Sequence, residues 1–196
     1  MKIIEPCAAS ASDRAQIERA AGILTGVDLK TIRYISPQFA TSQAGNSYVG
    51  FDTVLKGVEL SSASHVLVAM WWMEGAVEGL GFVLDPDEQF YADEGLHIVD
   101  VSRETQWAPM LKSALVSSAL SWHLPNGDAP RCVWSFRLNV KSGRSVTIAL
   151  GEVNESGDGL TYQPDSVAVI FDEPIAQRYR ILASTEPAWG TIVAQP

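Results

Sequence analysis

The chain has few of the residues from which metal sites and disulfide frameworks are built. Among its 196 residues are 2 cysteines and 3 histidines. No HxH or HExxH pattern occurs, and two cysteines are too few for the multi-bridge framework of small secreted domains. Cys132 lies in a strand pattern, so we expect a small, buried and inert thiol, while the state of Cys7 stays open. We therefore expect no metal, no cofactor and no disulfide framework.

Long apolar runs are also missing. The longest nearly uncharged run, Val66 to Met73, is far shorter than the roughly 20 residues that cross a bilayer. The stretch from Met1 to Ala8 has two apolar residues before a charge and a proline, fewer than the roughly 7–15 of a secretory signal. We therefore expect no transmembrane helix, no membrane contact and a cytoplasmic location.

Catalytic and phosphate-binding motifs are absent as well. A serine nucleophile would be signalled by GxSxG, and the nearest string, Gly45 to Gly50, has the wrong spacing. Gly79 and Gly81 lie inside a strand pattern, whereas phosphate loops place their glycines before a helix. The acids between Asp85 and Glu94 lack the ligand spacing of a calcium loop. These absences leave enzymatic activity undecided and favour a non-catalytic protein.

What is present is the composition of an ordinary globular protein, with 46% hydrophobic and 19% charged residues. A helix is predicted from Asp13 to Leu24, with Ser12 as its N-cap and Ile17, Ala20, Ala21 and Leu24 on its apolar face. A strand from Leu29 to Ile35 and a loop from Gln38 to Ser47 follow.

Two hairpins stand out in the strand pattern. Apolar and polar residues alternate from Arg131 to Lys141, and a Ser142-Gly143 turn leads into Arg144 to Leu150. Glu74-Gly75 takes the same turn position between the strands Val66 to Met73 and Val77 to Leu84. The core-facing residues of this other hairpin are predicted to be Val66, Val68, Met70, Trp72, Leu80 and Phe82.

Three ordered matches indicate that one β unit occurs twice. The matching segments are Leu55–Ala63 with Leu111–Ala119, Val66–Phe82 with Trp134–Leu150, and Tyr91–Val99 with Tyr162–Ile170. Each unit is predicted to be a four-stranded antiparallel meander. The remaining strands would be Thr53–Leu60, Leu96–Val101, Ala114–Leu124 and Val167–Phe171, and the connecting helices Ser102–Met110 and Pro174–Leu182.

The predicted fold is therefore α+β and mostly antiparallel β. Two related four-stranded meanders would pack as one sandwich or partly open barrel, with an N-terminal helix and short connecting helices. Residues 1–50 would form a helix and strand on the β core, 51–107 the first meander, 108–183 the second meander and 184–196 a C-terminal tail, all in one compact unit.

The adjacent tryptophans Trp71 and Trp72 would point to opposite faces of their strand. Both can be buried only if each face is covered, by the other sheet on one side and by a helix or a partner on the other. The N-terminal helix is the simplest cover. An apolar face left uncovered would mark an interface.

The formal net charge of −9 is unevenly distributed. Acids crowd residues 74 to 104, where Arg103 is the one base, whereas residues 131 to 151 contain bases and no acid. Complementary charge speeds association and suppresses wrong partners. The candidate interaction surface comprises Asp85, Asp87, Glu88, Asp93, Glu94, Arg131, Arg137, Lys141 and Arg144.

Two functions stay open on these observations. The leading hypothesis is a small, soluble, non-catalytic interaction module that binds a protein partner or a second copy in a homodimer. Nucleic acid is disfavoured as a partner by the overall negative charge. The alternative is a small-ligand-binding protein or a hydrolase that uses a cavity between the two β repeats, with Tyr91 and Tyr162 at its mouth.

Overall fold

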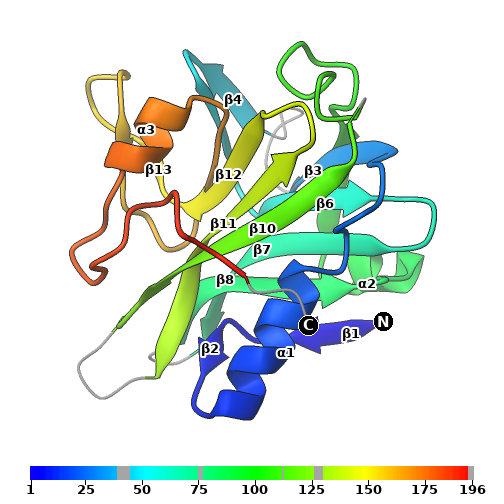
Figure 1. Cartoon of the computed structure of the whole chain (residues 1–196), viewed down its shortest axis with the longest axis horizontal. Coiled ribbons are helices and arrows are strands. Elements are labelled where there is room, and N and C mark those ends of the chain that lie inside the picture. The colour runs from blue at the N-terminus through cyan, green and yellow to red at the C-terminus, as the bar shows by residue number, and fades with distance from the viewer. Residues whose placement is uncertain (39–44, 75–76, 112, 126–129, 194–196) are drawn as a thin grey trace.

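The computed structural model describes residues 1–38, 45–74, 77–111, 113–125 and 130–193, which form two antiparallel sheets (Figure 1). The protein is mostly antiparallel β with three short helices, and the described strands do not close into a barrel. The predicted α+β class, rich in antiparallel β structure, is confirmed. A common origin of the two β units stays a prediction.

The first sheet has the strand order β1-β8-β7-β6-β3-β9. Its strands are β1 (Lys2–Ile4), β3 (Thr31–Pro37), β6 (Gly57–Ser61), β7 (Val66–Glu74), β8 (Val77–Leu84) and β9 (Leu96–Asp100). The predicted pairing of β7 with β8 is confirmed, and Gly75 of the predicted turn lies outside the described residues.

The second sheet has the order β16-β10-β11-β12-β15-β5-β4, and β2 also pairs with β11. Its strands are β2 (Cys7–Ala8), β4 (Gly45–Tyr48), β5 (Phe51–Val54), β10 (Leu115–His123), β11 (Arg131–Val140), β12 (Ser145–Leu150), β15 (Val167–Ile170) and β16 (Thr191–Ile192). A separate ribbon pairs β13 (Glu152–Val153) with β14 (Leu160–Thr161).

The meander prediction holds for one unit only. In the second sheet β10, β11, β12 and β15 are neighbours in chain order, as predicted. In the first sheet β6, β7 and β8 follow one another, but β9 pairs with β3 at the far edge instead of with β8. The N-terminal strands β1 and β3 lie on either side of this three-stranded group. Because both strands come from residues before 51, the strand pattern of residues 51–107 could not predict them.

Three local predictions are wrong. The stretch Thr53–Leu60 is divided between the sheets, because β5 ends at Val54 and β6 begins at Gly57. Residues 45–47 belong to β4 and not to a loop, while residues 39–44 lie outside the described part. Ser102–Met110 forms turns instead of a helix.

The predicted N-terminal helix is present as α1 (Ala11–Ala21), but its N-cap is Ser10 and not Ser12. The Ser10 hydroxyl accepts a hydrogen bond from the Asp13 amide, and the Asp13 carboxylate accepts one from the Ser10 amide. This reciprocal capping box satisfies two amides at once, which explains the earlier start. The other helices are α2 (Glu88–Asp93) and α3 (Glu173–Arg178), which begins one residue before the predicted Pro174–Leu182 segment and ends four residues earlier. Among the described residues, no helix is long and apolar enough to cross a membrane.

The main core lies between the sheets, where Phe82 of β8 meets Phe136 of β11 with ring centroids 5.2 Å apart. Leu67 and Ala69 of β7 belong to this core. The predicted core-facing set is therefore wrong for β7, whose Val68 and Met70 lie in a second cluster under α2. A strand buried on both faces reads as a continuous apolar run, so alternation does not reveal which face points inward.

The C-terminal segment is packed on the second sheet and is not a free tail. Ser135 Oγ donates a hydrogen bond to the Ala188 carbonyl, and β16 extends the sheet beside β10. The indole of Trp189 stacks on the Arg137 guanidinium at 3.8 Å. Arg137 is consequently only 5% exposed, which corrects the expectation that it points to solvent from the hairpin.

Candidate functional site

An open groove lies on the face of the first sheet that is turned away from the second sheet. Its volume is about 230 Å³. We call it the tryptophan groove; its apolar lining includes Ile3, Met70, Trp71, Trp72, Met73 and Phe90, and its charged lining is Lys56, Glu74 and Glu94. Met73 is 51% exposed and Ile3 44%, so apolar surface reaches solvent here. The helix expected to cover this face, α1, packs instead against β2, β8 and β10.

Glycines on β8 create room for the bulky residues of β7. Met70 pairs with Gly81, and Trp72 pairs with Gly79. A Cβ atom at Gly81 would lie 3.5 Å from the Trp72 ring, which therefore rests on this part of β8. The local sequence thus places the large side chains of β7 beside glycines of β8.

Lys56 is held against Trp71 at one side of the groove. Its Nζ atom lies 3.4 Å from the centroid of the Trp71 ring, and Trp71 Nε1 donates a hydrogen bond to the Leu55 carbonyl at 2.6 Å. Burial lowers the pKa of Lys56, and the Glu94 carboxylate acts in the opposite direction. The ring face also favours the charged ammonium, so Lys56 contributes a fixed cation in an otherwise apolar and acidic site.

A buried carboxylate fixes α2 beside the groove. Glu59 on β6 is 0% exposed and accepts hydrogen bonds from Arg33 Nε at 2.7 Å, from Ser61 and, through its other oxygen, from the Tyr91 hydroxyl of α2. Burial, followed by the Glu59 carboxylate, raises the pKa of Tyr91, which keeps the hydroxyl protonated as a donor. Phe90 packs beside it against Met70 and its neighbours. Tyr91 is therefore an anchor of the helix.

The acidic part of the predicted interaction surface is exposed around α2. Asp87 caps the helix by accepting a hydrogen bond from the Phe90 amide at 2.9 Å. Asp85 accepts one from the Val66 amide at 2.9 Å and lies 3.4 Å from His65 Nδ1. Glu94 ends the helix and reaches the groove. The exposed acids of this region are Asp85, Asp87, Glu88, Asp93 and Glu94.

The predicted basic residues are not gathered in one stripe. Arg131 begins β11, whereas Lys141 and Arg144 flank the turn at its other end, roughly 30 Å away along a strand of this length. Arg137 lies between these ends but is buried under Trp189. Among the described residues, the ion pairs are Arg14 with Glu18, Arg33 with Glu59 and His65 with Asp85.

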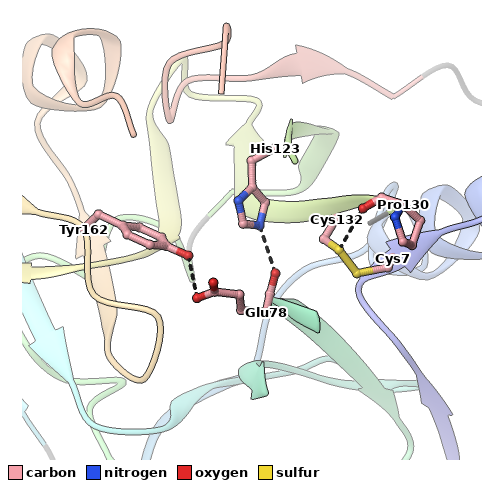
Figure 2. The surroundings of a disulfide bond; sticks show 6 residues. All are labelled: Cys7, Glu78, His123, Pro130, Cys132 and Tyr162. Carbon is pink, nitrogen blue, oxygen red and sulfur yellow. Dashed lines mark hydrogen bonds between the residues drawn. A yellow bond between two sulfur atoms is a disulfide. The ribbon is translucent and has the colours of Figure 1, made fainter. Parts of the chain in front are cut away.

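Tyr162 belongs to a second polar cluster, shown in Figure 2, and does not share a site with Tyr91. Its hydroxyl donates a hydrogen bond to Glu78 Oε2 at 3.1 Å. His123 donates from Nε2 to the Glu78 backbone carbonyl at 2.9 Å, and burial lowers the pKa of His123. The direction of this shift favours the neutral imidazole, and Nδ1 has no hydrogen-bond partner among the described residues. The hydrogen bond of His123 goes to the Glu78 backbone carbonyl, while the Glu78 carboxylate is bonded by Tyr162.

The same view shows a disulfide between Cys7 and Cys132 (Figure 2). The two residues are partners in the register of β2 and β11, so the expectation of a free, inert Cys132 thiol is wrong. A second groove of about 350 Å³, which we call the N-terminal groove, lies beside Cys7. Its lining includes Ile3, Glu5, Cys7, Asp13, Gln16 and Pro130.

Comparisons with protein-family models, with curated proteins and with solved structures give no match. Among the described residues, no three histidine, cysteine or acidic side chains are placed to hold a metal ion. Around β7 the structure brings together apolar surface, the Lys56 side chain stacked on Trp71, and surrounding acids.

Sequence reasoning identified the tryptophans and the acids but missed several groups around them. Glu59 and Arg33 lie on strands that are neighbours only after folding, and a single acid between Val58 and Leu60 gave no signal. The alternation in β6 could have suggested one polar face, but the strand was predicted as part of a longer one. The Cys7 partner was hidden by a sequence separation of 125.

Proposed function

We propose that this protein is a non-catalytic interaction module that docks a segment of a partner protein carrying an apolar anchor next to lysine or arginine. The observation that supports this most strongly is the open tryptophan groove beside the exposed acids of α2. An apolar patch with a polar rim is typical of protein interaction sites, and tryptophan is enriched among the residues that dominate binding energy.

The charges around the groove favour a basic partner. Glu74 and Glu94 line it, and Asp87, Glu88 and Asp93 extend the acidic surface along α2. Lys56 is the one base in the lining and is already stacked on Trp71. A positively charged segment would be steered to this surface, and the apolar anchor would then displace water from Trp72 and Met73.

The size of the groove sets the expected strength of binding. A volume of about 230 Å³ accommodates one or two side chains and is smaller than the pockets of drug-sized ligands, roughly 300–1,000 Å³. The interaction is therefore expected to be weak and reversible, with a Kd of about 1–100 µM.

The disulfide bears on the expected location. Cytosolic thiols are kept reduced, so the Cys7–Cys132 bond favours an oxidising compartment over the cytoplasm. Rapid alkylation of free thiols in cells, followed by mass measurement, tests this: an alkylated pair would support the cytoplasmic expectation, and an unalkylated pair an oxidising compartment.

Short fluorescent peptides test the proposed docking. The panel holds one leucine or phenylalanine constant and flanks it with lysine and arginine, with glutamate or with serine. Only the basic members should bind, and added salt should weaken them because the acids on α2 are exposed. Trp72→Ala should weaken binding by at least about tenfold, and Glu88→Lys with Glu94→Lys should reverse the preference for basic flanks.

Two variants away from the groove serve as matched controls. Leu182→Ala removes a fully exposed apolar side chain, and Glu155→Lys reverses an exposed acid on the second sheet's side. Neither should change peptide binding. The proposal would be refuted if peptide affinity did not depend on the flanking charge, or if Trp72→Ala left the affinity unchanged. Native mass spectrometry of the same samples distinguishes the other possible occupants of the groove. A second copy of the chain would double the mass, and a small ligand would add its own mass.

A further inference from the structure

We infer that the Cys7–Cys132 disulfide is a cleavable clasp, meaning a bond that holds the N-terminal segment in place and can be reduced in the folded protein. A low-molecular-mass thiol would enter the N-terminal groove and attack the Cys7 sulfur. Cleavage would loosen β1, which forms one wall of the tryptophan groove. The last part of this inference rests on the proposed docking function. The chemical part, attack at Cys7, stands on the geometry around the disulfide itself.

The two cysteine residues differ in exposure, which favours attack at Cys7. Cys132 is 0% exposed, whereas Cys7 is partly exposed and lines the N-terminal groove. A thiolate is the attacking species in disulfide exchange and must reach one sulfur directly. The groove, at about 350 Å³, admits a small thiol to Cys7 but leaves Cys132 shielded.

The exchange runs in two balanced steps. The incoming thiolate forms a bond to Cys7 Sγ, the Cys7–Cys132 bond breaks, and Cys132 leaves as a thiolate that takes up a proton. A second thiol then attacks the mixed disulfide and releases the Cys7 thiol. Two external thiols are thereby oxidised to one disulfide while the protein disulfide is reduced to two thiols.

One group beside Cys132 favours the reduced state. The Pro130 carbonyl oxygen lies 3.3 Å from the Cys132 sulfur, as Figure 2 shows. A disulfide sulfur has no hydrogen to donate, so this acceptor gains a donor only when Cys132 becomes a thiol.

The clasp holds a segment that touches both sheets. β1 pairs with β8 of the first sheet, and β2 pairs with β11 of the second. Apart from the disulfide, β2 is held by two register pairs with β11 and by packing against α1. The Val133 amide also donates to the carbonyl of Pro6, just before β2, at 2.9 Å. Ile3, within the same segment, lines both grooves. Release of Cys7 therefore frees one end of the strand that carries a wall of the tryptophan groove.

Three readings on the full chain test the inference. The oxidised protein is incubated with reduced glutathione, quenched by alkylation and mapped by peptide mass. Hydrogen exchange is measured at residues 2–8 before and after treatment, and the basic peptide is titrated into both samples. Cys7→Ser serves as a permanently open clasp, and its exchange should not respond to glutathione.

The expected result is a glutathione adduct on Cys7 and none on Cys132, with exchange at residues 2–8 faster by about tenfold or more. Peptide affinity should fall by about fivefold or more, since one wall of the groove is loosened. A disulfide that glutathione reduces only in urea, an adduct on Cys132, or unchanged exchange after opening would each overturn the inference. Faster exchange without peptide binding in either state would support the clasp and refute the proposed docking function.

Discussion

Tyr91→Phe probes how α2 is held beside the groove. The change removes one hydroxyl, and with it the only hydrogen bond to Oε2 of Glu59 among the described residues. Glu59 is 0% exposed, so the oxygen that loses its donor stays buried. Hydrogen bonds to charged groups contribute roughly 1.5–3 kcal/mol, and we expect the free energy of unfolding to fall by about 2 kcal/mol.

Urea unfolding measures this loss directly. With a denaturant slope of about 2 kcal/mol/M, the midpoint should fall by about 1 M while the slope stays unchanged. Tyr48→Phe is the matched control, because Tyr48 stacks on Phe51 through its ring, with centroids 5.1 Å apart, and the ring is retained. A midpoint that falls no further for Tyr91→Phe than for Tyr48→Phe would refute the anchoring role of the hydroxyl.

The same variant carries a pH signature. The folded-state pKa of Tyr91 is raised above the value of about 10 for an unfolded tyrosine, first by burial and then by Glu59. The raised pKa contributes stability that is fully present below pH of about 10 and is lost at higher pH, where the unfolded chain releases the proton first. The fall in stability of the wild-type protein above pH of about 10 should therefore be steeper than that of Tyr91→Phe. Parallel curves would contradict the assignment.

Two further changes test the N-terminal segment. Reduction of the Cys7–Cys132 disulfide should lower the free energy of unfolding by up to about 5 kcal/mol, because a bond with a sequence separation of 125 constrains a long loop of the unfolded chain. Calorimetry measures this change, and a loss below about 1 kcal/mol would contradict the reasoning. Gly79→Ala should cost about 1–3 kcal/mol, because its Cβ would lie 2.5 Å from Pro6, whereas Gly22→Ala, with its nearest neighbour at 3.4 Å, should be close to neutral in the same thermal melts.

The sequence predicted the elements whose pattern is local. β11 was recognisable because Phe136, Leu138 and Val140 alternate with polar residues, and α1 because its apolar residues recur at helical spacing. The inward face of β7 was not recognisable, because Val66 to Met73 is apolar at nearly every position and the four residues Leu67 to Met70 are all buried, with members in both core clusters. The break between β5 and β6 at Leu55 was not recognisable either. A chain that passes from one sheet to the other carries the same residue types before and after the break.

For the candidate site, the sequence supplied the ingredients but not their arrangement. The two adjacent tryptophans, Trp71 and Trp72, and an acidic stretch nearby were readable from residue order. The cover of Arg137 was not readable, because Trp189 lies far along the chain and reaches it only through the packed C-terminal segment. Long-range pairing decides these features, and a single sequence carries little trace of it.

The position of β5 has a consequence for cutting the chain into parts. Residues 108–196 contain most of the second sheet, but β15 pairs with β5, where Val167 faces Val54, and β4 lies beyond it. A fragment that begins at residue 108 would leave the edge of β15 open, and a fragment that ends at residue 107 would carry β2 without β11 and β5 without β15. Open strand edges are templates for aggregation. Neither half is therefore suited to separate expression, and any split version of this protein has to be assembled from both fragments together.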